Sequence, residues 1–354
     1  MQRDRTMSDI HFERRGHAGL VTLDRPAALN AVTGDMLRRL EEQLIGWEGD
    51  DAVRHVVIRA VPGRAFSVGG DIRHLYDRWK AGEPDLAFFE HEYRLNARIK
   101  HYPKPYVAVV DGLVMGGGVG VSLHGSHVVG ARMQFAMPEV GIGFFPDVGA
   151  TFILSRLPGS LGMEMALTGR RLQARECLAA GVATHLCEPK NVDAVIERLA
   201  QEEVEKALGP VVSRQQLIEH MPKRDRGDEA FALDSVPAIL KRLKTWGDHE
   251  AQDLLTALEE KSPTSLKVAH SQLKLGERLD FDDCMRLEYR IVSRILHGHD
   301  FYEGIRAQII DKDREPRWQP PTLDEVDASE VAKHLKPLER ELDVSDISRG
   351  PITA

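Results

Sequence analysis

Cysteine is scarce in this chain of 354 residues. Only Cys177, Cys187 and Cys284 are present, and they lie far apart in the sequence. Their spacing matches neither the paired ligands of a zinc site nor a redox motif. We therefore expect ordinary free thiols in a reducing compartment.

Long hydrophobic runs are also missing. No segment approaches the ~18 apolar residues that a membrane-spanning helix needs. The first ten residues lack the apolar centre of a signal peptide, and they carry acidic residues that are atypical of a transit peptide. Either Met1 or Met7 is compatible with the start of translation. These features predict a cytoplasmic protein that does not bind membranes.

Positive charge is not in excess. The chain has 47 Lys and Arg against 55 Asp and Glu, giving a net charge of −8 and an isoelectric point near 6.0. A general nucleic-acid binder normally carries a basic surface, so that class is disfavoured. An anionic small molecule held by a few local cations remains compatible with this balance.

The residues that are present suit a large folded unit of mixed α/β type. Hydrophobic residues make up 42% of the chain, enough for a sizeable core, and no repeat or low-complexity tract interrupts it. Strands are predicted at 19–23, 53–58 and 106–111. A helix is predicted from 33 to 47, with Thr33 as its cap. Strands that alternate with helices in this way indicate an α/β fold.

The pattern changes after about residue 190. We expect helices at 192–208, 236–246, 248–261 and 263–275, the last entered through Ser262 and Pro263. The segment 209–227, with its prolines and charged cluster, is expected to be a connection. The tail after Trp318 is expected to pack on the surface.

Residues 105–149 hold the most informative pattern. An apolar strand is followed by a glycine run, which we expect to open a helix, and then by the carboxylates Glu139 and Asp147 on a glycine-containing loop. Backbone N–H groups at such a turn have no intrahelical partner, so those near Gly70 and Gly117 are candidate donors to an oxyanion. The glycine spacings fit neither a dinucleotide-binding fingerprint nor a phosphate-binding P-loop.

The chain resembles the enoyl-CoA hydratase/isomerase (crotonase) superfamily and, within it, the 3-hydroxyisobutyryl-CoA hydrolase branch. The resemblance runs in order from about residue 12 to 320. It rests on these motifs: Leu-Asp-Arg-Pro at 23–26, Gly-Gly-Asp-Ile at 69–72, Phe-Phe-Glu-His-Glu-Tyr-Arg-Leu-Asn at 88–96, Met-Gly-Gly-Gly-Val-Gly at 115–120, Met-Pro-Glu at 137–139, Phe-Pro-Asp-Val-Gly at 145–149 and Gly-His-Asp-Phe-Tyr-Glu-Gly-Ile-Arg-Ala at 298–307. The last of these, with the added helices, is typical of the hydrolase branch.

The resemblance implies a role for each matching position. Gly70 and Gly117 would donate the two oxyanion-hole N–H groups, Glu139 would be the principal catalytic carboxylate, and Asp147 would be a second acid near the acyl group. The remaining implied contacts are with substrate. Glu92 would lie in the acyl pocket, the loop formed by Arg64, Ala65, Phe66, Ser67 and Val68 would lie along the CoA, and Arg25 and Lys312 are candidate phosphate contacts.

One position departs from the hydratase pattern. Hydratases of this superfamily hold a water between two carboxylates, one of which follows the glycine run. Here that position is Gly120, which has no side chain. The resemblance therefore favours hydrolysis, in which Glu139 acts either as a nucleophile through an acyl-enzyme anhydride or as a base for water.

Together these inferences predict a crotonase-like spiral of ββα units over residues 8–210 and a mainly helical region over 211–354. The expected activity is hydrolysis of a short β-hydroxyacyl-CoA, with 3-hydroxyisobutyryl-CoA of valine breakdown as the leading substrate. The alternatives are an enoyl-CoA hydratase or isomerase and a non-catalytic acyl-CoA-binding protein. No metal or redox cofactor is implied, since CoA is part of the substrate. His124 and His127, expected on the helix after the glycines, lack a third ligand for a metal. Assembly as a homo-oligomer is compatible with the superfamily.

Overall fold

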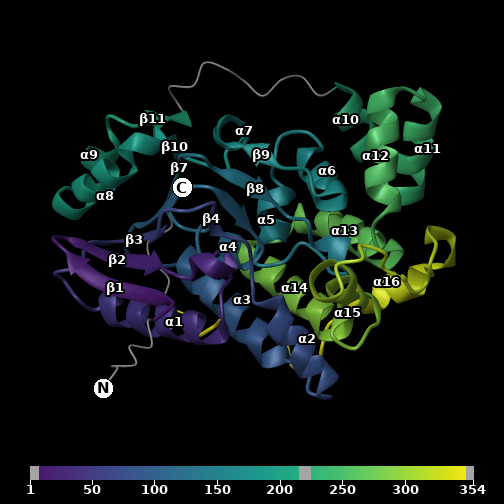
Figure 1. Cartoon of the computed structure of the whole chain (residues 1–354), viewed down its shortest axis with the longest axis horizontal. Coiled ribbons are helices and arrows are strands. Elements are labelled where there is room, and N and C mark those ends of the chain that lie inside the picture. Colours follow the sequence, from purple (N-terminus) through teal and green to yellow (C-terminus); the bar gives the residue numbers. More distant parts are fainter. Residues whose placement is uncertain (1–7, 215–224, 348–354) are drawn as a thin grey trace.

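Seven strands form the larger of two sheets in the computed structural model, which describes residues 8–214 and 225–347 (Figure 1). Their order across the sheet is β1, β2, β3, β5, β7, β10, β11. The central pairs from β2 to β10 are parallel, whereas β1 and β11 run antiparallel at the two edges. The strands are β1 Ile10–Arg15, β2 Ala18–Leu23, β3 His55–Ala60, β5 Tyr106–Val110, β7 His127–Gly130, β10 His185–Leu186 and β11 Val212–Ser213.

The smaller sheet has four short strands in the order β4, β6, β8, β9. They are β4 Ala65–Ser67, β6 Leu113–Met115, β8 Gln134–Ala136 and β9 Leu172–Gln173. Each of the pairs β3–β4, β5–β6 and β7–β8 places its first strand in the large sheet and its second strand in the small one. This repeated ββ step, followed by a helix, confirms the predicted spiral. The parallel strands β4, β6 and β8 end at the same edge, where a site can form.

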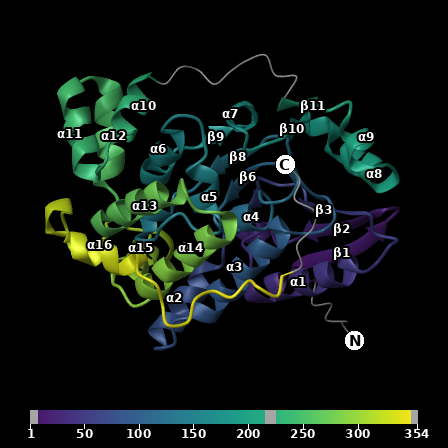
Figure 2. The ribbon, with the colours of Figure 1, turned by 180° about the vertical axis from the view of Figure 1, so that it is seen from behind.

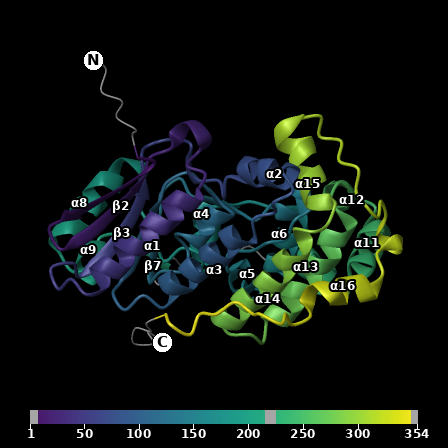
Figure 3. The same cartoon turned by 90° about the horizontal axis from the view of Figure 1, so that it is seen from below.

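The first helix forms where the apolar spacing predicts it. Helix α1 covers Gly34–Glu48, and the Thr33 hydroxyl accepts a hydrogen bond from the Met36 N–H as its N-cap. Its buried face consists of Met36, Leu37, Leu40, Leu44 and Trp47. The helix packs beside β1 and β2 (Figure 3). Amphipathic spacing and a capping threonine therefore suffice to place this element.

The other helices before residue 210 connect the strands of the two sheets. They are α2 Ile72–Lys80, α3 Leu86–Lys100, α4 Gly117–Gly120, α5 Ala150–Leu154, α6 Leu161–Thr168, α7 Ala174–Ala180, α8 Val192–Gln201 and α9 Val204–Leu208. Two expectations need correction. The segment 192–208 forms two helices because the backbone is extended at Glu202 and Glu203. The helix after the glycine run is a single turn, so His124 lies in the following turn and His127 begins β7.

The second part of the chain is helical, as predicted. Its helices are α10 Asp225–Phe231, α11 Val236–Trp246, α12 His249–Glu259, α13 Pro263–Gly276, α14 Phe281–Ile295, α15 Asp300–Ile305, a π-helix at Arg306–Ile310 and α16 Ala328–Leu335. Side chains of Ser235, Asp248 and Ser262 cap the helices that follow them. These caps explain why the sequence located α11, α12 and α13 closely.

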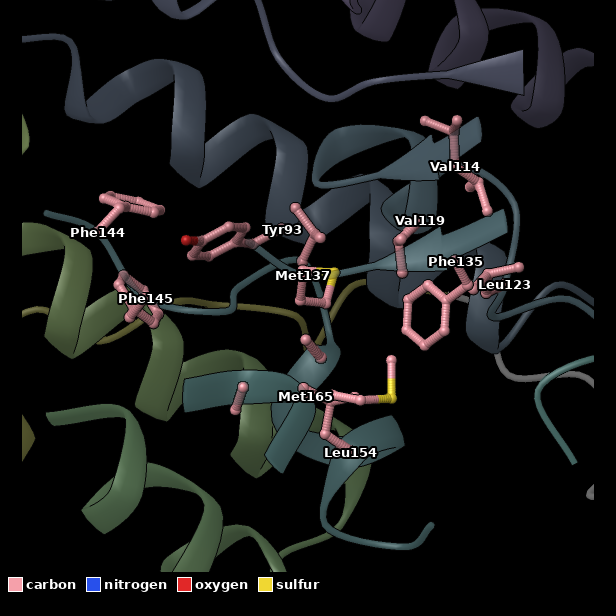
Figure 4. Close-up of a cluster of buried hydrophobic side chains, with 14 of the residues drawn as sticks. Tyr93, Val114, Val119, Leu123, Phe135, Met137, Phe144, Phe145, Leu154 and Met165 are labelled. Carbon is pink, nitrogen blue, oxygen red and sulfur yellow. The ribbon is translucent and has the colours of Figure 1, made fainter. Parts of the chain in front are cut away.

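The helical part packs directly against the strand-containing part. Helix α14 lies along α3, and α13 packs on α5 and α6 (Figures 1 and 3). One hydrophobic core includes side chains from both parts. In Figure 4 its centre joins Val114 of β6 and Phe135 of β8 with Tyr93 of α3 and Leu154 of α5. The helices thus cover one side of the site rather than standing apart from it.

The segment after α16 returns along the outside of the molecule. It runs past α14 and α3 toward α1 in Figure 2, and its own side chains Leu342, Val344 and Ile347 are buried against the body of the protein. Arg94 on α3 pairs with Asp346 at 2.8 Å, and Arg290 on α14 pairs with Glu341 at 2.9 Å. The expected surface packing of the tail is confirmed.

The predicted connection at 209–227 is partly described. Its start contains β11, which pairs with β10, and its end lies in α10. The remainder, including Lys223 and Arg224 of the charged cluster, lies outside the described residues. The division at residue 210 stays a prediction. Among the described residues, no helix combines the length and apolar character needed to cross a bilayer.

Candidate active site

A cavity of about 850 Å³ lies at the carboxyl ends of β4, β6 and β8. Helices α2 and α3 and the segment 137–147 form one part of its wall. The α12–α13 junction and residues 301–318 of the helical part form the rest. Among the residues singled out from the sequence, Val68, Gly70, Glu92, Gly117, Glu139 and Asp147 line this cavity. Folding therefore brings together groups that are up to 79 positions apart in the chain.

The two glycine segments face each other across the cavity wall. Gly69 and Gly116 have φ angles of +116° and +45°, a region that favours glycine. A Cβ on Gly117 would lie 3.2 Å from the Gly70 nitrogen and 2.6 Å from Glu92 Oε1. No side chain fits in this space, so glycine is required for the close approach of the two strands.

Both glycine N–H groups are available to a ligand. Gly70 and Val32 form a parallel β-bridge. In this bridge the Val32 N–H donates to the Gly69 carbonyl, and the Asp71 N–H donates to the Val32 carbonyl. The Gly70 N–H is therefore not used by this bridge. Gly117 is the first residue of α4, where an N–H has no intrahelical acceptor. Two backbone donors placed in this way suit the oxyanion hole that the sequence predicts, and this role stays a prediction.

Glu139 begins a short 3₁₀ helix directly after Pro138. Its side chain is 8% exposed, and its Oε2 atom has no hydrogen-bond partner in the described part of the chain. Its Oε1 atom lies 3.4 Å from the position of a Cβ on Gly116. Burial raises the pKa of Glu139 well above its usual range, and the charge of nearby Asp147 raises it further. The carboxyl group thus lies beside the predicted oxyanion hole in a poorly solvated place.

Asp147 is held by a tyrosine from α3. The Tyr93 hydroxyl donates a hydrogen bond of 2.8 Å to Asp147 Oδ2. Burial raises the pKa of Asp147 to about 7, although this hydrogen bond opposes the rise. The following residue, Val148, has a φ of +53°, which is rare for a β-branched residue. Its carbonyl accepts a hydrogen bond of 2.6 Å from His124 Nε2, which fixes the turn that carries Asp147.

Glu92 is the third carboxyl group of the cavity. It is 2% exposed, and its Oε1 atom has no partner among the described residues. Burial raises the pKa of Glu92 strongly, and the charges of Asp147 and Glu288 add to the effect. Three acids that share a buried space in this way are arranged to keep at least one proton near neutral pH.

Sequence reasoning missed a fourth buried acid, Glu288 on α14. Its carboxylate accepts hydrogen bonds from the Gly149 N–H at 2.8 Å and from the Thr151 N–H and hydroxyl at 2.9 and 2.6 Å. It is fully buried, and burial raises its pKa to about 8. The signal was available, since Glu288 interrupts an otherwise apolar helical stripe formed by Phe281, Cys284, Met285, Ile291, Val292 and Ile295. Glu288 ties the helical part to the loop after Asp147.

The predicted CoA-binding loop is divided by its strand. Val68 follows β4 and lines the cavity, whereas Arg64 precedes β4 and faces a separate cavity of about 300 Å³. Between them, the Ala65 and Phe66 side chains are buried. The role of this segment in CoA binding stays a prediction.

The two candidate phosphate contacts lie in different surroundings. Arg25 pairs with Asp71 at 2.9 Å and donates to the Ala31 carbonyl, so its guanidinium is held within the protein. Lys312 is exposed and has a φ of +60°. The cations that line the cavity are instead Lys261 and Arg314.

Gly120 packs against an amide. A Cβ at Gly120 would lie 2.6 Å from Asn96 Nδ2. Asn96 is fully buried on α3, one helical turn after Glu92. The position at which hydratases carry their second carboxylate is therefore occupied here by Gly120 and lies beside Asn96. Within residues 8–214 and 225–347, no group of three metal-binding side chains is arranged to hold an ion.

The comparisons with known proteins agree with this architecture. A sequence model of the enoyl-CoA hydratase/isomerase family matches residues 18–335. The chain is 40% identical to the zebrafish (Danio rerio) protein named 3-hydroxyisobutyryl-CoA hydrolase, mitochondrial, over 97% of this chain and 93% of that one. Identity to the human (Homo sapiens) protein of the same name is 38%, over 93% and 89% of the two chains.

Solved structures give the same result for the fold. The structure titled carnitinyl-CoA dehydratase from Mycobacterium thermoresistibile is 37% identical with a TM-score of 0.89, covering 96% of this chain and 99% of that one. An enoyl-CoA hydratase from Rhodobacter sphaeroides is also 37% identical, with a TM-score of 0.84 over 94% and 98%. The named curated relatives are mitochondrial, so the expected cytoplasmic location is not confirmed. On the family match and on these nearly full-length similarities, the chain belongs to the enoyl-CoA hydratase/isomerase family.

Proposed function

We propose that this protein hydrolyses the thioester of a short β-hydroxyacyl-CoA, with 3-hydroxyisobutyryl-CoA as its substrate. The observation that carries the proposal is the meeting of the Gly70 and Gly117 N–H groups with Glu139 and Asp147 in one cavity. The names of the zebrafish and human relatives support the same reaction and substrate. The products are 3-hydroxyisobutyrate and CoA.

In the first step, the thioester carbonyl oxygen accepts hydrogen bonds from the two glycine N–H groups. As the carbonyl carbon is attacked, negative charge develops on this oxygen, and each donor stabilises the transition state by roughly 2.7–4 kcal/mol. Glu139 either attacks the carbon itself, giving an anhydride that water then hydrolyses after the CoA thiolate has left, or removes a proton from a water that attacks the carbon directly. Both routes require Glu139 to be ionised.

Asp147 suits a role in proton transfer. With a pKa of about 7 it exchanges a proton readily near neutral pH. We assign it to the substrate hydroxyl or to protonation of the leaving thiolate. A buried carboxyl group held by Tyr93 keeps a fixed position for either task.

Hydration of an enoyl-CoA is the second candidate, because the two solved neighbours carry the names of a dehydratase and a hydratase. Against it stands Gly120, which supplies no carboxylate and is packed against Asn96. We therefore rank hydrolysis first.

The proposed substrate places the reaction in valine breakdown. The proposal needs no metal or redox cofactor, since the chemistry uses two amide donors and a carboxylate. We also propose that the protein is cytoplasmic and that it assembles as a homo-oligomer.

Replacing Glu139 by Gln tests the assignment. Free thiol release from 3-hydroxyisobutyryl-CoA and loss of enoyl absorbance from crotonyl-CoA are followed separately. We expect the wild-type protein to release thiol, and E139Q to lose at least about a hundredfold of this turnover while still binding CoA, because a neutral amide neither attacks nor accepts a proton.

The matched control is E42Q, which makes the same change at an exposed residue of α1. Thiol release that is equal in E139Q and E42Q would exclude Glu139 from the chemistry. Enoyl loss without thiol release in the wild type would instead favour the hydratase.

A trapping experiment distinguishes the two routes of Glu139. If an anhydride forms, hydroxylamine added during turnover converts Glu139 to a hydroxamate, which mass spectrometry detects in the peptide that contains it. An unmodified peptide after complete turnover would indicate that Glu139 acts as a base.

A further inference from the structure

Asn96 has an unusual environment for a buried amide. It is fully buried, yet neither Nδ2 nor Oδ1 has a hydrogen-bond partner in the part of the chain that the structure describes. Leaving a buried donor or acceptor unpaired destabilises the fold, because the group loses the hydrogen bonds that it makes to water in the unfolded chain. Buried polar groups without a protein partner are commonly satisfied by an internal water.

The surroundings of Asn96 indicate where such a water would bind. Asn96 and Glu92 are four residues apart on α3, so they lie on one face with Cβ atoms about 6 Å apart. This face packs on α4 at Gly117 and Gly120, whose missing side chains make room for both polar groups. Glu92 Oε1 lies 2.6 Å from the Cβ position of Gly117, and Asn96 Nδ2 lies 2.6 Å from that of Gly120, so both polar ends face the same turn of α4.

Glu92 supplies the other half of the site. Its Oε1 atom is also without a partner among residues 8–214 and 225–347. Together with Nδ2 and Oδ1 of Asn96, it gives three polar atoms, and an internal water typically makes two to four hydrogen bonds. A water here accepts from the amide N–H and donates to Glu92 Oε1.

We propose that Asn96 is a positioning residue that holds the carboxyl group of Glu92 through one internal water. The proposal rests on the proposed function, in which Glu92 contacts the acyl part of the substrate. Asn96 itself does not line the cavity, so its effect on the reaction passes through Glu92.

The first measurement is a crystal structure of the wild-type protein at a resolution that shows ordered waters. We expect one water within hydrogen-bond distance of both the Asn96 amide and Glu92, and its absence from N96L. A structure in which Asn96 and Glu92 contact each other with no water between them would overturn the proposal. This measurement is independent of the substrate, so it stands even if the wild-type protein does not hydrolyse 3-hydroxyisobutyryl-CoA.

The second measurement compares the thiol-release kinetics of N96L, E92Q and the double variant. Loss of one hydrogen bond to a carboxyl group predicts that N96L lowers kcat by roughly tenfold or more, with a smaller change in KM. The double variant should be no slower than E92Q alone, because Asn96 acts only through the carboxyl group that E92Q removes. If the fold losses in kcat of N96L and E92Q multiply in the double variant, Asn96 acts independently of Glu92.

N96S serves as the second variant if N96L does not fold. A serine hydroxyl still binds water, so N96S should retain more activity than N96L or N96A. Equal activity of N96S and N96A would contradict the proposal. Failure of the wild-type protein to release thiol would refute the proposed function and leave the crystallographic result on Asn96 to be judged by itself.

Discussion

At the scale of single residues, the burial of carboxyl groups away from water determines the protonation behaviour of the site. Glu92, Glu139, Asp147 and Glu288 are all buried, and no cation in the described part of the chain lowers the pKa of any of them. Desolvation is the first cause of the raised pKa of each group, and repulsion from a neighbouring carboxylate adds to it for Glu92, Glu139 and Glu288. Hydrolysis needs Glu139 ionised, so its rate should rise with pH over a range that lies above the ordinary pKa of a glutamate.

The Tyr93 hydroxyl sets part of this pH dependence. Its hydrogen bond stabilises ionised Asp147 and lowers the pKa of that group. In Y93F the pKa of Asp147 rises above about 7, so Asp147 keeps the proton that it donates to the leaving thiolate up to a higher pH, and we expect the basic limb of the kcat/KM profile to move up by about one pH unit. Y102F is the control, because Tyr102 donates to the Leu44 carbonyl and not to Asp147. A basic limb at the same pH in Y93F and wild type would contradict this assignment.

At the scale of elements, the site depends on the fit between α3 and α4. Helix α4 consists of a single turn, and its glycine backbone lies against the polar side chains of α3. Its sequence, Gly-Gly-Val-Gly, has little helix propensity. Packing in the buried surroundings, rather than propensity, therefore keeps this turn in place.

Adding one methyl group at Gly120 tests this fit. A Cβ at this position would meet Asn96 Nδ2 at 2.6 Å, so G120A forces the buried amide or the helix to move. We expect the free energy of unfolding to fall by about 1–3 kcal/mol, as for other overpacked sites. G34A on α1 is the matched change, since a Cβ there would meet Phe88 at an ordinary 3.7 Å.

Chemical denaturation of the two variants provides the measurement. G34A should unfold within about 1 kcal/mol of the wild type, because alanine is the better helix former. Equal stability of G120A and wild type would show that the α3–α4 contact tolerates a larger side chain.

At the scale of the whole molecule, the helical part completes the site. Glu288 on α14 holds the loop after Asp147, and Gln272 on α13 donates to the Pro146 carbonyl at 2.6 Å. Phe301, Arg314 and Trp318 supply further cavity wall. The site therefore depends on contacts between segments more than 120 residues apart in the chain.

Glu288 couples this packing to pH. Its pKa is about 8 in the folded protein against an ordinary value of 4.5. Between these values the folded state keeps a proton that the unfolded state releases, so the free energy of unfolding falls as pH rises from about 5 to 8. In E288Q this contribution is absent, and the decline with pH should be shallower.

Denaturant titrations at pH 5, 6.5 and 8 measure the effect. E288Q also loses the acceptor for one N–H group, so we expect it to be less stable than wild type at pH 5 by about 1–3 kcal/mol. The control is E277Q, an exposed glutamate beside α13. If the free energy of unfolding of E288Q falls with pH as steeply as that of the wild type, Glu288 is not the cause of this pH dependence.

The sequence by itself determined the elements and the chemistry of the candidate site. Local signals act over a few residues, so the Thr33 cap, the apolar strand at 106–110 and the helix entry at Ser262 were predictable. The motifs around Gly70, Gly117, Glu139 and Asp147 named groups that the cavity does bring together.

Only the tertiary structure decided what burial does to these groups. The division of 192–208 into two helices and the single turn of α4 follow from packing, which local patterns do not encode. Glu288 contacts the loop after Asp147, and Asn96 contacts Gly120. Each contact joins two elements that are distant in the sequence, and no local sequence pattern predicts such a pair. Desolvation and close packing depend on every neighbour in space, and for that reason the raised pKa values appear only once the chain is folded.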